Sequence, residues 1–250
     1  MCRVKRAKNE ANQQAGRRKC VALMPGHSAW SKITRMIQLH YYPSTASMAP
    51  HILLEEIGAP YERVLVDRSH NVHKTQQYLQ LNPNGLIPAL TDGDLVLYES
   101  AAICLYLCDS HPEAALAPPL GSAERAHFYK WLMWLTNTLQ ATLIVYFYPE
   151  RWMNASNAAG AAELKTHAEA RVRVLLDQLD TELARHGGPW LLGDAYTTVD
   201  AYTLMLCRWT RNFGQPARLR AQLGPYLQRV LARPAVQRAF ASEGLAQPWV

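Results

Sequence analysis

The sequence predicts an α+β protein of two domains, a small α/β domain followed by an all-α helical domain. Strand-like and helical patterns alternate from residue 36 to residue 111, as in a sheet covered by helices. A segment rich in proline and glycine, 112–121, interrupts this alternation. From residue 122 to residue 250, apolar residues recur at helical spacing. We therefore expect two domains joined by a linker at 112–121.

The composition is that of an ordinary globular protein. Of 250 residues, 49% are hydrophobic and 18% are charged, which excludes a disordered or fibrous chain. No apolar run approaches the length that spans a bilayer, so we expect no membrane association. The five cysteines form neither a zinc spacing nor a disulfide framework, which favours a reducing, cytoplasmic location. We also expect no metal, because the histidines and carboxylates show no ligand motif.

The basic charge is concentrated in residues 1–35. They hold nine Lys or Arg and one acid, whereas the remainder holds seventeen basic and nineteen acidic residues. The mildly acidic remainder predicts no nucleic-acid partner. Residues 1–35 lack apolar periodicity, and Met36 directly precedes a strand-like run. We interpret them as a basic, disordered extension that need not be translated; a nucleic-acid or membrane-surface arm and a targeting segment are the alternatives.

Residues 36–66 predict a strand, a helix and a second strand. Ile37–Tyr41 alternates apolar and polar side chains and predicts a strand. Ala49–Ile57 has a helical pattern, and Gly58 directly after it favours a helix end with left-handed backbone. The stretch Tyr61–Val66 is rich in strand-forming residues.

The remainder of the first domain predicts a short helix, a hairpin and a third helix. The helix Lys74–Leu81 precedes a turn cluster. Leu86–Leu90 and Leu95–Tyr98 predict two strands joined by an Asp-Gly-Asp turn. Glu99–Cys108 predicts a helix. We expect its buried face to contain Ala101, Ala102, Leu105 and Tyr106.

Pro88 lies within the first strand of this hairpin. Because proline cannot donate to a strand ladder, the residue indicates either an edge strand or a special backbone geometry. A cis-proline at this point would leave nearby backbone groups available to an extended ligand. Both interpretations are compatible with the composition of the strand.

The second domain contains two long helical patterns and a capping signal. Glu124–Tyr146 and Ala161–Arg185 carry apolar residues at core spacing, and a Gly-Gly-Pro sequence follows the second. Thr197 and Asp200 form a capping-box pattern before the helix Ala201–Arg208, an arrangement that contributes about 1 kcal/mol. Two shorter helices are expected at Leu223–Leu231 and Val236–Phe240.

Three segments resemble the thioredoxin-like half of cytosolic glutathione transferases. They are the loop Tyr41–Ser47, the Asn-Pro-x-Gly-x-x-Pro segment within Asn82–Leu90, and Leu97–Leu107 with its Glu-Ser-x-x-Ile pattern. The resemblance covers residues 36–250 and implies an N-terminal thioredoxin-like domain followed by an all-α C-terminal domain. It further implies a homodimer that conjugates the glutathione thiolate, as a co-substrate, to a small hydrophobic electrophile.

The thiolate of glutathione must be favoured over the thiol, and a hydroxyl hydrogen bond together with a helix N-terminus can do this. The loop after the first strand offers the hydroxyls of Tyr41, Tyr42, Ser44, Thr45 and Ser47. We assign the two tyrosines to packing and rank the others Ser44, Thr45, then Ser47. Ser47 is equally compatible with an N-cap role. The loop is similar to the Ser-Ser-Cys-Ser loop of the zeta class, whose active serine falls on Ser44.

Two positions of this loop depart from the classes that it resembles. The stretch Pro43–Ile52 looks like the bacterial beta class, in which a catalytic cysteine stands where this chain has Ala46. Ala49 replaces the arginine expected after the zeta-class loop. The cysteine nucleophile of the beta class is therefore absent, and Ala49 argues against the particular isomerase activity of the zeta class.

The resemblance also implies positions for the glutathione tripeptide. Ile87, which precedes Pro88, would pair its backbone with the cysteinyl part, as in strand addition. Glu99 and Ser100 open the third helix and suit the γ-glutamyl amine and carboxylate; an ordinary helix cap is the alternative. Candidates for a cation near the glycyl carboxylate, by position alone, are His73 and Lys74.

The electrophile is expected against the long helix of the second domain. Where the beta class has Asn, His and Lys along this helix, the chain has Met133, Gln140 and Ala141, which predicts a more apolar pocket. Candidate lining residues are Tyr129, Met133, Trp134, Asn137, Tyr146 and Trp209, among which we favour Met133, Trp134 and Asn137.

Two other functions stay compatible with the same resemblance. One is a glutathione-dependent isomerase or reductase, because a fold does not fix the chemistry. The other is a non-catalytic binding protein, favoured by the missing cysteine and by the substituted Asn, His and Lys positions.

Overall fold

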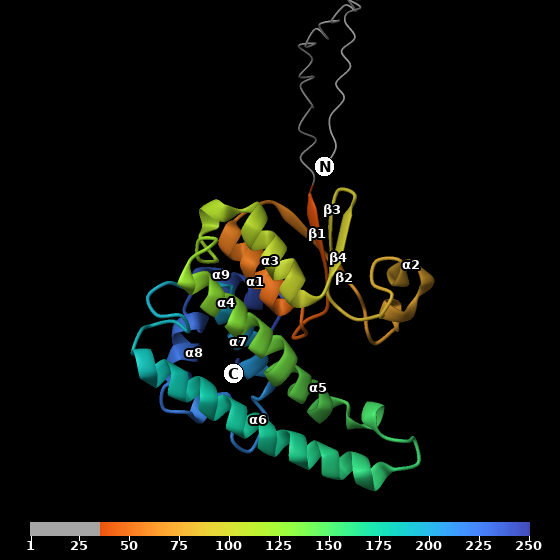
Figure 1. Ribbon diagram of the computed structural model, residues 1–250. Coiled ribbons are helices and arrows are strands. Elements are labelled where there is room, and N and C mark those ends of the chain that lie inside the picture. The colour runs from red at the N-terminus through yellow and green to blue at the C-terminus, as the bar shows by residue number, and fades with distance from the viewer. Residues whose placement is uncertain (1–35) are drawn as a thin grey trace, which may run out of the picture. The chain divides into compact units, whose positions relative to one another are not determined.

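A four-stranded sheet forms the centre of the N-terminal domain in this computed structural model (Figure 1). The structure describes residues 36–250, so the interpretation of residues 1–35 lies outside the described residues. The strand order is β2-β1-β3-β4, with β1 parallel to β2 and antiparallel to β3. The strands are β1 Ile37–Tyr41, β2 Tyr61–Leu65, β3 Ala89–Asp92 and β4 Leu95–Tyr98.

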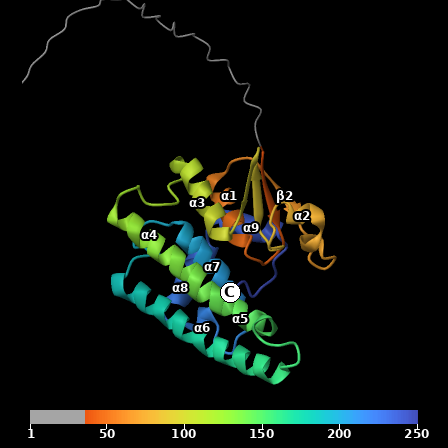
Figure 2. The ribbon, with the colours of Figure 1, turned by 45° about the vertical axis from the view of Figure 1, so that its right-hand side comes forward.

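Helices cover both faces of this sheet. Helices α1, Met48–Ile57, and α3, Ser100–Ser110, lie on one face, and the short α2, Gln76–Leu79, lies on the other (Figure 2). Leu39 of β1 pairs in register with Leu90 of β3, and both side chains are fully buried. The order of strands and helices, and the mixed sheet, are those of a thioredoxin-like domain, as predicted.

The predicted end of α1 is confirmed, whereas the predicted start of β3 is wrong. Gly58 has φ 71° and donates its N–H to the Leu54 carbonyl, which confirms the predicted helix end. The Ile87–Pro88 peptide is cis, but β3 begins at Ala89 rather than at Leu86. The Leu86 carbonyl instead accepts hydrogen bonds from the Tyr78 hydroxyl and the Asn82 side-chain amide, so it does not pair with a neighbouring strand.

The buried face of α3 differs from the prediction. Ala102 is exposed, and Ala101, Leu105 and Tyr106 are only partly buried. Almost every position of this helix is apolar, so periodicity could not distinguish its faces; packing against α1 does. The buried residues are Ser100, Ile103, Cys104, Leu107 and Cys108.

The C-terminal domain is helical, and its first long helix contains a π-helical segment. Residues 135–140 adopt π-helix between two α-helical parts, and apolar side chains along this helix, including Leu132 and Leu139, are buried. The helices are α4 Ala123–Trp134, the π-helical Leu135–Gln140, α5 Ala141–Phe147, α6 Ala158–His186, α7 Thr198–Trp209, α8 Leu223–Leu231 and α9 Pro234–Ser242. Short 3-10 turns span Val72–Lys74, Pro112–Ala114, Pro149–Trp152 and Ala217–Leu219.

The predicted capping box at the start of α7 is present. The Thr197 side chain accepts from the backbone of Asp200, and the Asp200 carboxylate accepts from the Thr197 backbone N–H at 2.8 Å. The carboxylate also accepts from the Leu191 backbone N–H and the Tyr226 hydroxyl. Asp200 therefore ties α7 to α8 and to the loop before it.

The last helix returns to the first domain. α9 packs against α1, so residues 36–250 belong to one compact unit that includes both domains. Within that range, no helix has the length and apolar character needed to cross a membrane.

Candidate active site

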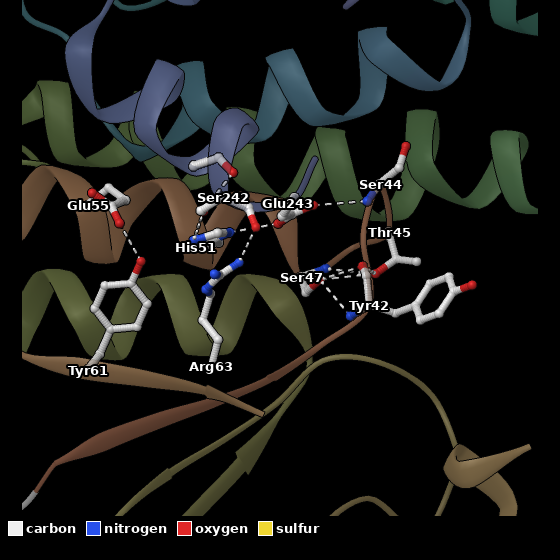
Figure 3. A network of polar contacts seen from close by, with 11 residues as sticks. Tyr42, Ser44, Thr45, Ser47, His51, Glu55, Tyr61, Arg63, Ser242 and Glu243 are labelled. Carbon is white, nitrogen blue, oxygen red and sulfur yellow. Dashed lines mark hydrogen bonds and ion pairs between the residues drawn. The ribbon is translucent and has the colours of Figure 1, made fainter. Parts of the chain in front are cut away.

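The loop between β1 and α1 carries the candidate catalytic hydroxyls (Figure 3). Ser44 lies at its turn with φ 60°, in the left-handed region that favours glycine. A non-glycine residue in such a conformation costs about 1–3 kcal/mol and needs support from its surroundings. Two residues of the C-terminal domain, Glu243 and Arg208, supply this support.

Ser44 is held from both its backbone and its side chain. Its N–H donates to Glu243 Oε2 at 3.0 Å, and its Oγ accepts from Arg208 Nε at 3.3 Å (Figure 3 shows the first contact). The hydroxyl hydrogen of Ser44 has no acceptor among residues 36–250. This hydrogen can therefore be donated to a ligand.

The hydroxyls of Thr45 and Ser47 both donate hydrogen bonds within the loop. Thr45 Oγ1 donates to the Tyr42 carbonyl at 2.7 Å and lies 3.0 Å from Ser47 Oγ. Ser47 Oγ donates to the same carbonyl at 3.1 Å and is fully buried. Ser47 occupies the N-cap position of α1, but its side chain makes no capping hydrogen bond. Both side chains thus stabilise the loop.

Arg208 of α7 brings a positive charge to this loop. Its side chain is buried, and it donates to the carbonyls of Pro248 and Trp249 as well as to Ser44. Burial and, to a smaller extent, the neighbouring charge of Arg211 lower the pKa of the guanidinium to about 10, although Glu243 acts in the opposite direction. Arg208 therefore remains protonated at neutral pH.

A buried pair lies behind Ser44. His51 Nδ1 of α1 is 2.6 Å from Glu243 Oε1, and the two side chains are 0% and 1% exposed (Figure 3). Ser242 Oγ lies 3.4 Å from the other ring nitrogen of His51. Glu243 thus joins α1 and the Ser44 turn to the end of α9.

The positions predicted for the tripeptide lie close to this loop. Ile87, next to the cis Pro88, lines the same cavity as Ser44, and its amide and carbonyl have no partner among the described residues. Glu99 has φ 72° and its side chain makes no capping bond to α3. Ser100 Oγ donates to the Ala46 carbonyl at 3.0 Å, which ties α3 to the loop.

The cavity in front of Ser44 has a volume of about 370 Å³. It lies between the loops of the first domain and the ends of α5 and α7. Within residues 36–250, its wall contains five basic or histidine side chains and no carboxylate. The lining residues include Ser44, Thr45, Ala46, Ile87, Arg68, His73, Lys74, Gln140, Ile144, Phe147, Tyr148, Arg151, Trp209 and Arg211.

A second cavity of about 530 Å³ adjoins the first. Glu99 and Ser100 line it together with Asn137 of the π-helical segment. Gln140 and Ile144 line both cavities, and Gln140 accepts a hydrogen bond from the Tyr202 hydroxyl. The candidate γ-glutamyl and cysteinyl positions thus open onto neighbouring cavities.

Comparison with known proteins identifies the family. Residues 35–109 match the model of the glutathione S-transferase N-terminal domain, and residues 147–243 match a model of the C-terminal domain. Glutathione S-transferase GST-4.5 of Xanthomonas campestris pv. campestris is 32% identical over 211 residues, which cover 84% of this chain and all of that protein. The chain belongs to the glutathione S-transferase family.

Solved structures of other glutathione S-transferases support the assignment of this chain to the family. A sphingomonad glutathione S-transferase complexed with glutathione is 34% identical, with a TM-score of 0.72 over 84% of this chain and all of that one. The bacterial beta class transferase of Sphingomonas chungbukensis is 32% identical with the same TM-score and coverage. The predicted resemblance and the transferase activity that it implies are confirmed.

The structure separates the residues that we favoured for the electrophile. Asn137 lines the cavity beside Glu99, whereas Met133 and Trp134 of this transferase line neither cavity. Met133 is 43% exposed, and Trp134 packs edge-on against Trp131. Trp209, one of the wider candidates, lines the cavity in front of Ser44.

Several lining residues of the transferase cavity were not predicted. Phe147 and Tyr148 lie three and four residues after Ile144, on the same side of the helix as Gln140 and Ile144. Helical spacing could therefore have predicted them. Arg68, Arg151 and Arg211 come from three separate loops and give no local signal. They add positive charge to the wall of a pocket that was predicted only to be more apolar than in the beta class.

Proposed function

We propose that Ser44 stabilises the glutathione thiolate and that the transferase conjugates this thiolate to an electrophile in the cavity before it. The free hydroxyl hydrogen of Ser44 is the observation that carries the proposal, because Thr45 and Ser47 donate theirs to Tyr42. Arg208 adds a positive charge beside the serine oxygen. Both effects favour the charged form of a bound thiol.

The tripeptide would extend from the N-terminus of α3 to the loop that carries Lys74. Glu99 and the first amides of α3 suit its γ-glutamyl end, and the unpaired backbone of Ile87 suits its cysteinyl part. At the other end, Lys74 or His73 would meet the glycyl carboxylate, since both line the Ser44 cavity.

Comparison of Ser44→Ala with Thr45→Ala tests the assignment. A hydrogen bond to a charged group contributes about 1.5–3 kcal/mol, so Ser44→Ala should lower kcat about tenfold to a hundredfold. It should also raise the pKa of the bound thiol, measured from the ultraviolet absorbance of the thiolate. Thr45→Ala is the matched control and should leave that pKa nearly unchanged.

Three outcomes would contradict the proposal. A Ser44→Ala enzyme with an unaltered thiol pKa would show that another group stabilises the thiolate. Regeneration or oxidation of glutathione during turnover would favour the isomerase or reductase alternative over conjugation. Binding of glutathione without turnover of any electrophile would favour the non-catalytic alternative.

We also propose a cytoplasmic homodimer that works without a metal. The thiols of Cys104, Cys108 and Cys207 are buried and form no disulfide among the described residues, which suits a reducing compartment. Light scattering tests the dimer by its mass, twice that of the chain. The apolar side chains that support it are Leu95, Val96, Tyr98, Tyr129 and Met133, all exposed on β4 and α4.

A further inference from the structure

The cavity in front of Ser44 carries more positive charge than glutathione can neutralise. Lys74, Arg68, Arg151 and Arg211 line it, and none of them forms a salt bridge within residues 36–250. In the part of the chain that the structure describes, no Asp or Glu lines the same cavity. The glycyl carboxylate of a bound glutathione occupies one of these positions, which leaves cations for a second anion.

The two domains contribute these cations separately. Lys74 lies on the side of the glutathione loops, where its Nζ donates to the Gly85 carbonyl at 3.2 Å. Arg151 and Arg211 lie on the helical side, Arg151 in the turn after α5 and Arg211 just after α7. Arg151 and Arg211 thus line the cavity from the helical domain, the side on which we expect the electrophile.

Aromatic side chains stand beside these arginines. The Arg151 guanidinium lies 3.9 Å from the centre of the Tyr148 ring, and Arg68 donates to the Tyr148 hydroxyl at 3.1 Å. Phe147 is 43% exposed and packs edge-on against Trp209, with ring centres 6.3 Å apart. The wall therefore offers an apolar surface bordered by charged donors.

We infer that this transferase prefers an aromatic electrophile that bears an anionic group such as a carboxylate. The ring would lie against Phe147 and Trp209, and the anion would bind Arg151 and Arg211. This inference rests on the proposed function, because it assigns a substrate class to the Ser44 site. It narrows the small hydrophobic electrophile that the family resemblance implies to an aromatic one with an anionic group.

The reaction with an aryl chloride of this class is balanced without a further reactant. The thiol proton passes to solvent, and the thiolate sulfur forms a bond to the ring carbon that carries chlorine. The carbon–chlorine bond then breaks, and chloride leaves with the electron pair. The carboxylate on the ring takes no part in bond changes and serves only for recognition.

A matched pair of probes tests the preference. The neutral probe is 1-chloro-2,4-dinitrobenzene and the anionic probe is 4-chloro-3,5-dinitrobenzoate, and the kcat/KM of each is divided by its uncatalysed rate with glutathione. We expect the wild type to favour the benzoate, and added salt to weaken the preference. Arg151→Gln with Arg211→Gln should reduce it about tenfold or more, because charged hydrogen bonds are lost.

Two further variants separate recognition from folding and from general charge. Arg151→Lys with Arg211→Lys keeps the charge and should retain part of the preference. Arg173→Gln removes an exposed arginine of α6 that does not line the cavity, and it should leave the preference intact. A double Gln variant with the wild-type preference would overturn the inference.

The alternative role of the arginines is binding of glutathione itself. If the double Gln variant weakens glutathione binding and slows both probes equally, the arginines serve the tripeptide and the inference is wrong. If the wild type turns over neither probe, conjugation fails, and binding of preformed conjugates still tests the anion site. Tighter binding of the conjugate with a carboxylate on its dinitrophenyl ring than of the conjugate without one would support the site, and equal affinity would overturn it.

Discussion

At the scale of single residues, Arg208 joins the catalytic loop to the end of the chain. One guanidinium donates to the Ser44 hydroxyl and to two carbonyls at 248 and 249, and it is 3% exposed. Because it touches Ser44 rather than glutathione, we regard it as a positioning residue. Its charge and its geometry can be separated experimentally.

Substitution of Arg208 tests this role. Arg208→Lys keeps a cation but loses the fork of donors, so we expect a loss of about 1–3 kcal/mol in the free energy of unfolding. Arg208→Gln also removes the charge, and it should additionally raise the pKa of the bound thiol. Urea unfolding measures the first effect, and thiolate absorbance the second. Equal thiol pKa values in the two variants would show that the charge does not act on the sulfur.

At the scale of elements, the capping box of α7 predicts an unusual dependence of stability on pH. Burial raises the pKa of the Asp200 carboxyl from 3.8 to about 6, against the effect of its hydrogen bonds. The folded protein therefore holds this proton at pH values where the unfolded chain has released it. The stabilisation is complete below about pH 4 and is lost as the pH rises through about 6.

Asp200→Asn removes this titration and serves as the reference. The difference in free energy of unfolding between wild type and Asp200→Asn should shrink by about 2–3 kcal/mol as the pH rises from about 4 to about 7. Urea unfolding across this range measures it. A difference that grows with pH would show that the donors from Leu191, Thr197 and Tyr226 outweigh burial.

Sequence patterns predicted most of the elements, but the π-helical segment placed some side chains on a face that regular helical spacing did not predict. Helical spacing gave the long helix and its buried side, and short motifs gave the capping box and the Gly58 end. An α-helix turns about 100° per residue, so the wider π turn at 135–140 rotates the face that follows it by about that angle. Met133 therefore does not share the cavity face of Ile144, and regular spacing misplaced it. Loop residues such as Arg151 and Arg211 depend on tertiary contacts alone.

At the scale of the whole molecule, the Glu243–His51 pair connects the two domains through the site. Removal of one partner of a buried pair costs about 3–5 kcal/mol, so Glu243→Ala should destabilise the protein by about that amount. It should also weaken glutathione binding, because the Ser44 N–H loses its acceptor. Urea unfolding and calorimetry measure the two effects.

A surface pair provides the control for this change. In α6, Arg185 Nη2 lies 2.8 Å from Glu182 Oε1, and the Arg185 side chain is 66% exposed. Glu182→Ala should cost no more than about 1 kcal/mol and leave glutathione binding unchanged. A Glu243→Ala protein no less stable than Glu182→Ala would mean that the buried pair does not hold the domains together.

The contacts of Ser44 also bear on how the protein matures during synthesis. Its partners Arg208 and Glu243 follow it by 164 and 199 residues. The thioredoxin-like sheet can pair its strands as soon as β4 has left the ribosome, but the left-handed turn at Ser44 gains its support only once α9 has emerged. Nascent chains should therefore acquire the ability to ionise glutathione late and in one step, so that shorter translation products do not generate the reactive thiolate.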